Sequence, residues 1–189
     1  MTEQHPKQLA AYKLAQDHLG LKEIAGKQHN KEIVDFFAAV GHGWVKDDET
    51  AWCAAFVGAM LNEAGLSSTK ALNAWSYLDW GVEVPLAEAK VGDLVVFWRG
   101  SPSAATGHVG FFEAETDKTI RVLGGNQSNS VSVAGYKKEQ LLSVRRMPRR
   151  LHPMPPMPEP EVKQEKPKSL IDVIGGIIMA FINSLKGGK

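Results

Sequence analysis

The residue best suited to nucleophilic chemistry in this chain is its single cysteine, Cys53. It stands where a polar run, residues 48–51, gives way to an apolar stretch whose composition predicts a helix. Because the first backbone N–H groups of a helix are unpaired and its dipole is positive there, we expect a stabilised thiolate and a lowered pKa for Cys53. The alternative is a structural thiol packed among Trp52, Phe56 and Val57, since free cysteine is among the most buried residue types.

A thiol nucleophile needs a base that takes its proton and a third group that orients the base. Among the six histidines, His108 is the strongest candidate, because it begins a predicted strand and the glycines beside it, Gly107 and Gly110, allow close approach. His42 also has glycine neighbours and stays a second candidate. The others are expected on the solvated surface: His5, His18, His29 and His152.

The strand after His108 offers a candidate for the third group. If residues 107–113 and 119–126 form an antiparallel hairpin centred on Asp117, opposed residues have numbers that sum to about 234. His108 then faces Asn126, whose carboxamide oxygen could accept a hydrogen bond from the imidazole. A bulge at Gly124-Gly125 would instead shift the register and bring Gln127 in. Asn126 as an ordinary loop residue is the remaining alternative.

The arrangement of predicted elements is helices first and strands later. Apolar residues at helical spacing predict helices that end near Gly20, Gly41 and Gly65, the third starting at about residue 50, and a short fourth covers residues 73–80. Strands are predicted over residues 93–98, 107–113, 120–123, 130–133 and 141–145. This order predicts an α+β domain in which N-terminal helices pack on an antiparallel β-sheet.

The carboxyl-terminal fifth of the chain has a different composition. We expect the catalytic-sized domain to span residues 1–150 and a proline-rich linker to span residues 151–168, since six of the ten prolines lie in residues 153–167. Residues 169–189 predict an amphipathic helix. Its apolar part, residues 170–185, is shorter than the roughly 20 residues that cross a bilayer, so membrane contact at the interface is expected. Docking on the domain or self-association are the alternatives.

Composition excludes several classes of function. A chain of 189 residues that is 43% hydrophobic can bury a core. A net charge of +1 provides no field for nucleic acid, which is therefore not an expected partner. One cysteine cannot form an intrachain disulfide, and no zinc-binding pattern is present. The first residues lack the apolar core of a secretory signal, so we expect synthesis in the cytoplasm without a signal peptide.

Four motifs in order resemble the CHAP family, the cysteine, histidine-dependent amidohydrolases/peptidases of the papain-like NlpC-type superfamily. They are Asp47 to Val57 around the cysteine, Gly92 to Phe97, Gly107-His108-Val109-Gly110, and Gly124-Gly125-Asn126-Gln127. The resemblance covers residues 19–146 and implies a papain-like CHAP fold. It also implies a hydrolase of amide bonds in bacterial peptidoglycan, with Cys53 as nucleophile, His108 as general base and Asn126 as the polar third member.

The resemblance implies no cofactor. Some CHAP enzymes bind calcium near the cysteine, but Asp47, Asp48 and Glu49 lack the alternating spacing of a calcium loop, so we interpret them as acids at the start of the helix and expect no metal. A short CHAP enzyme with an appended amphipathic tail resembles a phage or prophage endolysin, a muramoyl-L-alanine amidase or stem-peptide endopeptidase acting at the cell wall or periplasm during host lysis. The alternatives are an interbacterial amidase effector, a tail-associated lysin, or a wall-binding or membrane-active protein without catalysis.

Overall fold

The computed structural model describes residues 2–104 and 106–149. The predicted linker over residues 151–168, the predicted amphipathic helix over residues 169–189 and the predicted boundary at residue 150 all lie outside the described residues. None of the described helices has the length and apolar character needed to cross a membrane.

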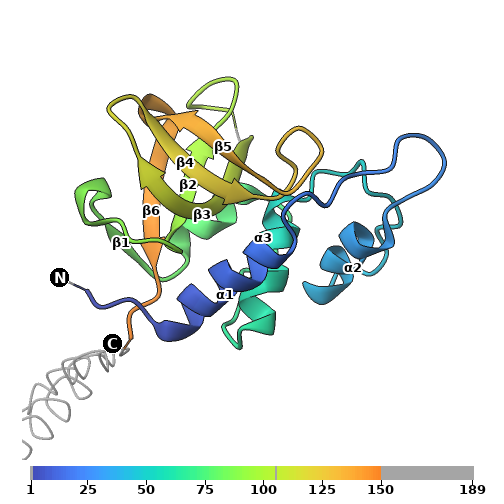
Figure 1. The fold of residues 1–189 in the computed structure, drawn as a ribbon, viewed down its shortest axis with the longest axis horizontal. Coiled ribbons are helices and arrows are strands. Elements are labelled where there is room, and N and C mark those ends of the chain that lie inside the picture. The colour runs from blue at the N-terminus through green and yellow to red at the C-terminus, as the bar shows by residue number, and fades with distance from the viewer. Residues whose placement is uncertain (1, 105, 150–189) are drawn as a thin grey trace, which may run out of the picture. The chain divides into compact units, whose positions relative to one another are not determined.

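Three α-helices come first in the chain: α1 (Pro6–Asp17), α2 (Lys31–Ala39) and α3 (Cys53–Glu63). Side chains at two of the starts explain where these helices begin. His5 Nδ1 accepts from the Lys7 N–H ahead of α1, and Asn30 accepts from the Glu32 N–H ahead of α2. Both α1 and α2 contact α3, so α3 is the central helix of this layer (Figure 1).

Six antiparallel strands form one sheet with the spatial order β1-β6-β2-β3-β4-β5. The strands are β1 (Val82–Val84), β2 (Leu94–Trp98), β3 (Gly107–Glu115), β4 (Thr119–Gly124), β5 (Ser132–Lys137) and β6 (Leu141–Arg146). Short 3₁₀ turns lie at η1 (Ala74–Asp79), η2 (Leu86–Glu88) and η3 (Lys138–Gln140). The predicted α+β arrangement, with helices packed on an antiparallel sheet, is confirmed; the short edge strand β1 was not predicted.

The sheet is buried on both faces, although the helices cover only one of them (Figure 1). On the helical face, α3 is buried from Cys53 to Leu61 and packs against β3. On the other face, the ring of Tyr136 in β5 stacks on Phe97 in β2, with ring centroids 4.8 Å apart. Because β3 and β4 lie between these two strands in the sheet, the sheet must curl to bring the rings together. It thereby encloses a second apolar core.

A buried ion pair fastens the start of β2 to the end of β6. Arg146 and Asp93 have no exposed side-chain surface, and their closest nitrogen and oxygen atoms are 2.6 Å apart. The same guanidinium donates to the carbonyl oxygens of Thr2 and Glu88, so its remaining hydrogen-bonding capacity is also used. A buried charge pair tolerates its desolvation only with such additional hydrogen bonds. The pair therefore anchors the N-terminal segment and the strand that leads toward the loop at Arg99.

Candidate functional site

Cys53 is the first residue of α3 and is only 7% exposed. Trp52 precedes it and makes no side-chain hydrogen bond to the helix start, so the first N–H groups of α3 have no side-chain cap. Burial raises the pKa of the Cys53 thiol, although backbone hydrogen bonds from Val109 and Ala54 and the charge of Arg99 act in the lowering direction. The expected lowering of the thiol pKa is therefore wrong, because desolvation of the thiolate outweighs the helix start.

His108 lies in β3, next to Val109, and is 1% exposed. Its ring stacks on Tyr136, with centroids 4.8 Å apart and an angle of 8° between the planes. Tyr136 stacks in turn on Phe97, the residue paired with His108 across β2 and β3. These contacts fix the plane of the imidazole. The other glycine-flanked histidine, His42, is partly exposed; its Nε2 lies 2.7 Å from the Lys70 carbonyl oxygen and its ring lies near Trp44, so it is not part of this cluster.

A hydrogen bond to Gln127 determines which nitrogen of His108 carries the proton. His108 Nε2 lies 3.1 Å from Gln127 Oε1. The Gln127 amide nitrogen donates to the carbonyl oxygens of Val122 and Ser132, so the atom facing His108 is the amide oxygen, which can only accept. His108 Nε2 must therefore donate, and Nδ1 of the neutral ring keeps its lone pair. The imidazole is held in the tautomer that a base acting through Nδ1 requires.

The expected pairing between His108 and Asn126 is wrong, because the hairpin ends before it reaches Asn126. The pairs Phe111 with Leu123 and Phe112 with Val122 follow the predicted register. However, β4 stops at Gly124, and Asn126 adopts a left-handed backbone with φ of 55°.

Gln127, which the alternative register predicted, forms the hydrogen bond to the imidazole of His108 that was predicted for Asn126. Gly124 makes room for this contact. A Cβ there would lie 3.0 Å from His108 Nε2 and 3.2 Å from Gln127 Oε1. Either distance is tighter than most real Cβ contacts, so a larger residue would push the two side chains apart.

A groove of about 410 Å³ opens beside Cys53. Small or uncharged residues make up most of its lining, and Arg99 is the exception; the lining residues are Ala51, Cys53, Leu72, Asn73, Ala74, Arg99, Gly100, Thr106 and Gly107. The sequence analysis did not single out Arg99 as a site residue. No motif marks Arg99 in the sequence, because it reaches the groove only through the folded connection between β2 and β3, which also brings Gly100, Thr106 and Gly107 to the lining.

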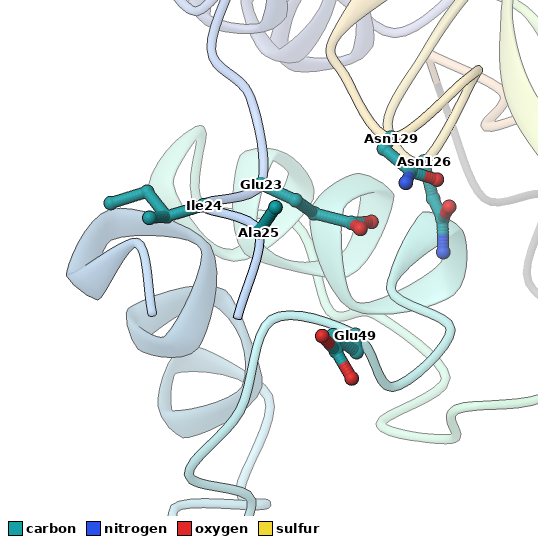
Figure 2. Close-up of a pocket in the computed structure, with 6 residues that line it drawn as sticks. All are labelled: Glu23, Ile24, Ala25, Glu49, Asn126 and Asn129. Atoms are coloured by element: carbon teal, nitrogen blue, oxygen red, sulfur yellow. The ribbon is translucent and has the colours of Figure 1, made fainter. Parts of the chain in front are cut away.

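A separate pocket of about 360 Å³ contains the side chain of Asn126 (Figure 2). The Glu23 side chain extends across it toward Asn126 and Asn129, and Glu49 also contributes to its lining (Figure 2). Glu23 accepts a hydrogen bond of 2.7 Å from the indole nitrogen of Trp52, the residue before the cysteine. Asn126 thus lies close to the helix start but belongs to an acidic pocket and not to the His108 cluster.

The acids ahead of α3 do not act as its first-turn residues, because the helix begins only at Cys53. Asp48 is buried and accepts from the N–H groups of Ile24 and Asn30, and it contacts His29 Nδ1 at 3.0 Å. Burial acts to raise the pKa of Asp48, but these hydrogen bonds outweigh it and the pKa is lowered. Asp48 therefore holds the loop over residues 24–30. Within residues 2–104 and 106–149, no cluster of three or more histidine, cysteine or acidic residues could hold a metal ion.

Comparison with known proteins finds one family model that matches part of the chain. Residues 45–126 match the CHAP domain family model. The matched residues include Cys53, His108 and Asn126 and end one residue before Gln127. None of the curated proteins compared with the chain matches it.

The chain is also similar to solved structures of NLP/P60 proteins. One is an NLP/P60 family protein from Staphylococcus aureus subsp. aureus Mu50, described as similar to a lipoprotein: 15% identity, TM-score 0.49, coverage of 78% of this chain and 43% of that chain. Another is the P60 domain of an antigen of M. avium subspecies paratuberculosis: 13% identity, TM-score 0.46, coverage of 75% and 95%. A third is a mutated form of the resuscitation promoting factor interacting protein RipA: 14% identity, TM-score 0.47, coverage of 76% and 63%. The chain thus spans less than half the length of the staphylococcal protein.

The burial of His108 has a consequence for stability. Burial, together with the charge of Arg99, lowers the pKa of His108 to about 4, although the hydrogen bond to Gln127 acts to raise it. In the unfolded chain a histidine has a pKa of about 6.5. Between these two values only the unfolded state binds the proton. The stability that neutral His108 contributes is therefore fully present above about pH 6.5 and is lost as the pH falls toward 4.

We predict that His108→Phe removes this part of the pH dependence, because phenylalanine keeps the ring stacked on Tyr136 and cannot be protonated. Between pH 7 and pH 4, the free energy of unfolding of the wild type should fall by about 3 kcal/mol more than that of the variant. Denaturant unfolding at both pH values measures the difference. Equal losses in the two proteins would show that His108 is protonated in the folded state.

Proposed function

We propose that this protein hydrolyses an amide bond of bacterial peptidoglycan, with Cys53 as nucleophile, His108 as general base and Gln127 as the residue that orients the base. The observation that carries this proposal is that a buried cysteine at the start of α3 lies beside the backbone of Val109, and that the residue before Val109 is a buried histidine whose Nε2 bonds to Gln127. Nucleophile, base and orienting group are the three parts that thiol-dependent acyl transfer needs. The match to the CHAP family supports the same chemistry.

The tautomer of His108 defines the proton transfers of this mechanism. The Cys53 thiol gives its proton to His108 Nδ1 as the sulfur attacks the amide carbonyl, and the backbone N–H of Cys53 stabilises the resulting oxyanion. Collapse of the tetrahedral intermediate breaks the C–N bond, and the proton on Nδ1 moves to the leaving amine. Water then hydrolyses the thioester with His108 as base, which restores the thiol and releases a carboxylate.

The electrostatics of the site favour a neutral resting pair. Burial raises the thiol pKa of Cys53 and lowers the imidazole pKa of His108, so at neutral pH the thiol and the imidazole are both uncharged. Proton transfer and attack on the substrate are then coupled, because a thiolate and an imidazolium would otherwise both have to form as buried charges. We propose that the thiol becomes reactive only when a carbonyl is bound beside it.

We further propose that the chain acts as an endolysin, cleaving the wall during host lysis either as a muramoyl-L-alanine amidase or as a stem-peptide endopeptidase. Support for this role comes from the sequence alone: the apolar and polar alternation of residues 169–189 suits contact with a membrane interface, after a proline-rich spacer. Cells expressing the full chain should lyse once the inner membrane is permeabilised. Survival equal to that of cells expressing Cys53→Ala would reject the lytic role.

Digestion of purified peptidoglycan tests the hydrolase directly. We predict that the wild type releases soluble fragments and that Cys53→Ala releases none, because alanine cannot form the thioester. Mass spectrometry of the fragments identifies the bond: free stem peptides with a new L-alanine amine indicate an amidase, and shortened stems on glycan indicate an endopeptidase. Cys53→Ser, which matches the thiol in shape, is the control for folding. Equal digestion by wild type and Cys53→Ala would contradict the proposal.

We predict that Gln127→Ala lowers kcat by roughly ten- to a hundredfold, because His108 loses the acceptor that fixes its tautomer and position. Asn126→Ala is the matched comparison one residue away and should have a much smaller effect on kcat. Initial rates of fragment release from the same peptidoglycan measure both. A larger loss in Asn126→Ala than in Gln127→Ala would restore Asn126 as the orienting residue.

A further inference from the structure

Arg99 has a fixed position at the end of the strand pair that carries His108. It follows directly after β2, and its backbone N–H donates to the Thr106 carbonyl at 2.9 Å, which continues the β2–β3 ladder beyond Trp98 and Gly107. The Thr106 hydroxyl also donates to the Arg99 carbonyl at 2.9 Å. Arg99 is exposed at this point and lines the groove beside Cys53 together with Thr106 and Gly107.

The guanidinium of Arg99 differs from the other arginines that the structure describes. Each of those forms an ion pair with a carboxylate: Arg121 with Glu113, Arg145 with Glu83, Arg146 with Asp93 and Arg149 with Glu3. Within residues 2–104 and 106–149, Arg99 has no ion pair and no side-chain hydrogen bond. It is the only charged residue that lines the groove beside Cys53, and no acid lines that groove with it. An exposed guanidinium in an otherwise uncharged groove is available to an incoming anion.

We propose that Arg99 binds a carboxylate of the substrate next to the scissile amide and so determines which stem peptides are cleaved. This inference rests on the proposed function, since it assigns a substrate group to the groove of that same site. A guanidinium presents parallel N–H donors that match the two oxygens of a carboxylate. A carboxamide at the same position offers one acceptor and no charge. The site therefore distinguishes stem peptides with a free carboxyl from those in which that carboxyl is amidated.

The charged residues around the start of α3 also favour binding of the substrate carboxylate at Arg99. The pocket next to Trp52 carries Glu23 and Glu49, whereas the groove next to Cys53 carries only Arg99. A substrate with a free carboxylate is repelled by the first region and attracted by the second. The acidic pocket thus favours placing the carboxylate in the groove.

Arg99 also acts on the catalytic pair through its charge, and the test must separate this effect from binding. Its charge lowers the pKa of both Cys53 and His108. Loss of the charge changes the reactivity of the pair toward every substrate equally, so it cancels in a ratio of two substrates. A lost contact to a carboxylate changes that ratio.

The experiment uses two synthetic stem peptides that differ only in one group, a free carboxyl or its carboxamide. For the wild type we expect kcat/KM to be about tenfold higher for the carboxylate peptide, the size of one partly exposed charge-assisted contact. For Arg99→Gln the ratio should fall to about one, and Arg99→Lys should keep part of it. Arg121→Gln removes an equally charged arginine in β4, outside the groove, and should keep the wild-type ratio. A ratio of one in the wild type, or an unchanged ratio in Arg99→Gln, overturns the inference.

Binding to a variant without the nucleophile separates this inference from the proposed function. Calorimetric titration of Cys53→Ala should give about tenfold tighter binding of the carboxylate peptide, and Cys53→Ala with Arg99→Gln should lose the difference. If the wild type cleaves neither peptide but this Arg99-dependent binding is present, the hydrolase proposal fails and the carboxylate site stands. If cleavage occurs with no preference and binding shows none, the carboxylate site fails and the hydrolase stands. Absence of both cleavage and binding overturns the two together.

Discussion

The packing of the first turn of α3 against β3 is the constraint on which the rest of the site depends. It buries Cys53 at the helix start and brings its sulfur beside the backbone of Val109, the neighbour of His108. Both ionisable groups leave water together, so each favours its neutral form. The helix start and the charge of Arg99 reduce the cost of forming a thiolate but do not overcome burial. The neutral state of both groups is thus a consequence of how the fold encloses Cys53 and His108.

A second requirement follows, because a neutral imidazole can act as a base through only one of its nitrogens. The turn after β4 satisfies this requirement with Gln127, whose amide nitrogen is held by two backbone carbonyls and whose oxygen faces His108. The turn is left-handed at Asn126, Ser128 and Asn129, with φ between 52° and 59°. Such backbone is uncommon outside glycine, and here it points Gln127 inward while Asn126 lines another pocket.

Local patterns in the sequence were sufficient for much of this structure. The helix ends near Gly20, Gly41 and Gly65 follow from periodicity and turn residues, which act over a few positions. The predicted β3–β4 register holds at Phe111 and Phe112, and a bulge shifts it by one residue at Ala114. The predicted pairing of Asn126 with His108 was wrong because the chain leaves β4 at Gly124. Gly125 packs closely against Trp52 there, and Trp52 is distant in sequence, so local patterns do not show this contact. The predicted lowering of the thiol pKa of Cys53 was wrong for a related reason. A helix start can be predicted from the sequence, but the burial that outweighs its effect on the pKa is produced by the whole fold.

The central claim is that the imidazole of His108 is neutral at rest, with its proton on Nε2 and a free lone pair on Nδ1. Nitrogen NMR of the folded protein labelled at histidine, recorded from pH 4 to pH 8, tests this claim most directly, with His108→Phe identifying the signal. We predict a protonated Nε2 and an unprotonated Nδ1 throughout most of this range, with protonation only as the pH approaches about 4. A proton on Nδ1, or titration of His108 near its usual value of about 6.5, would contradict the account.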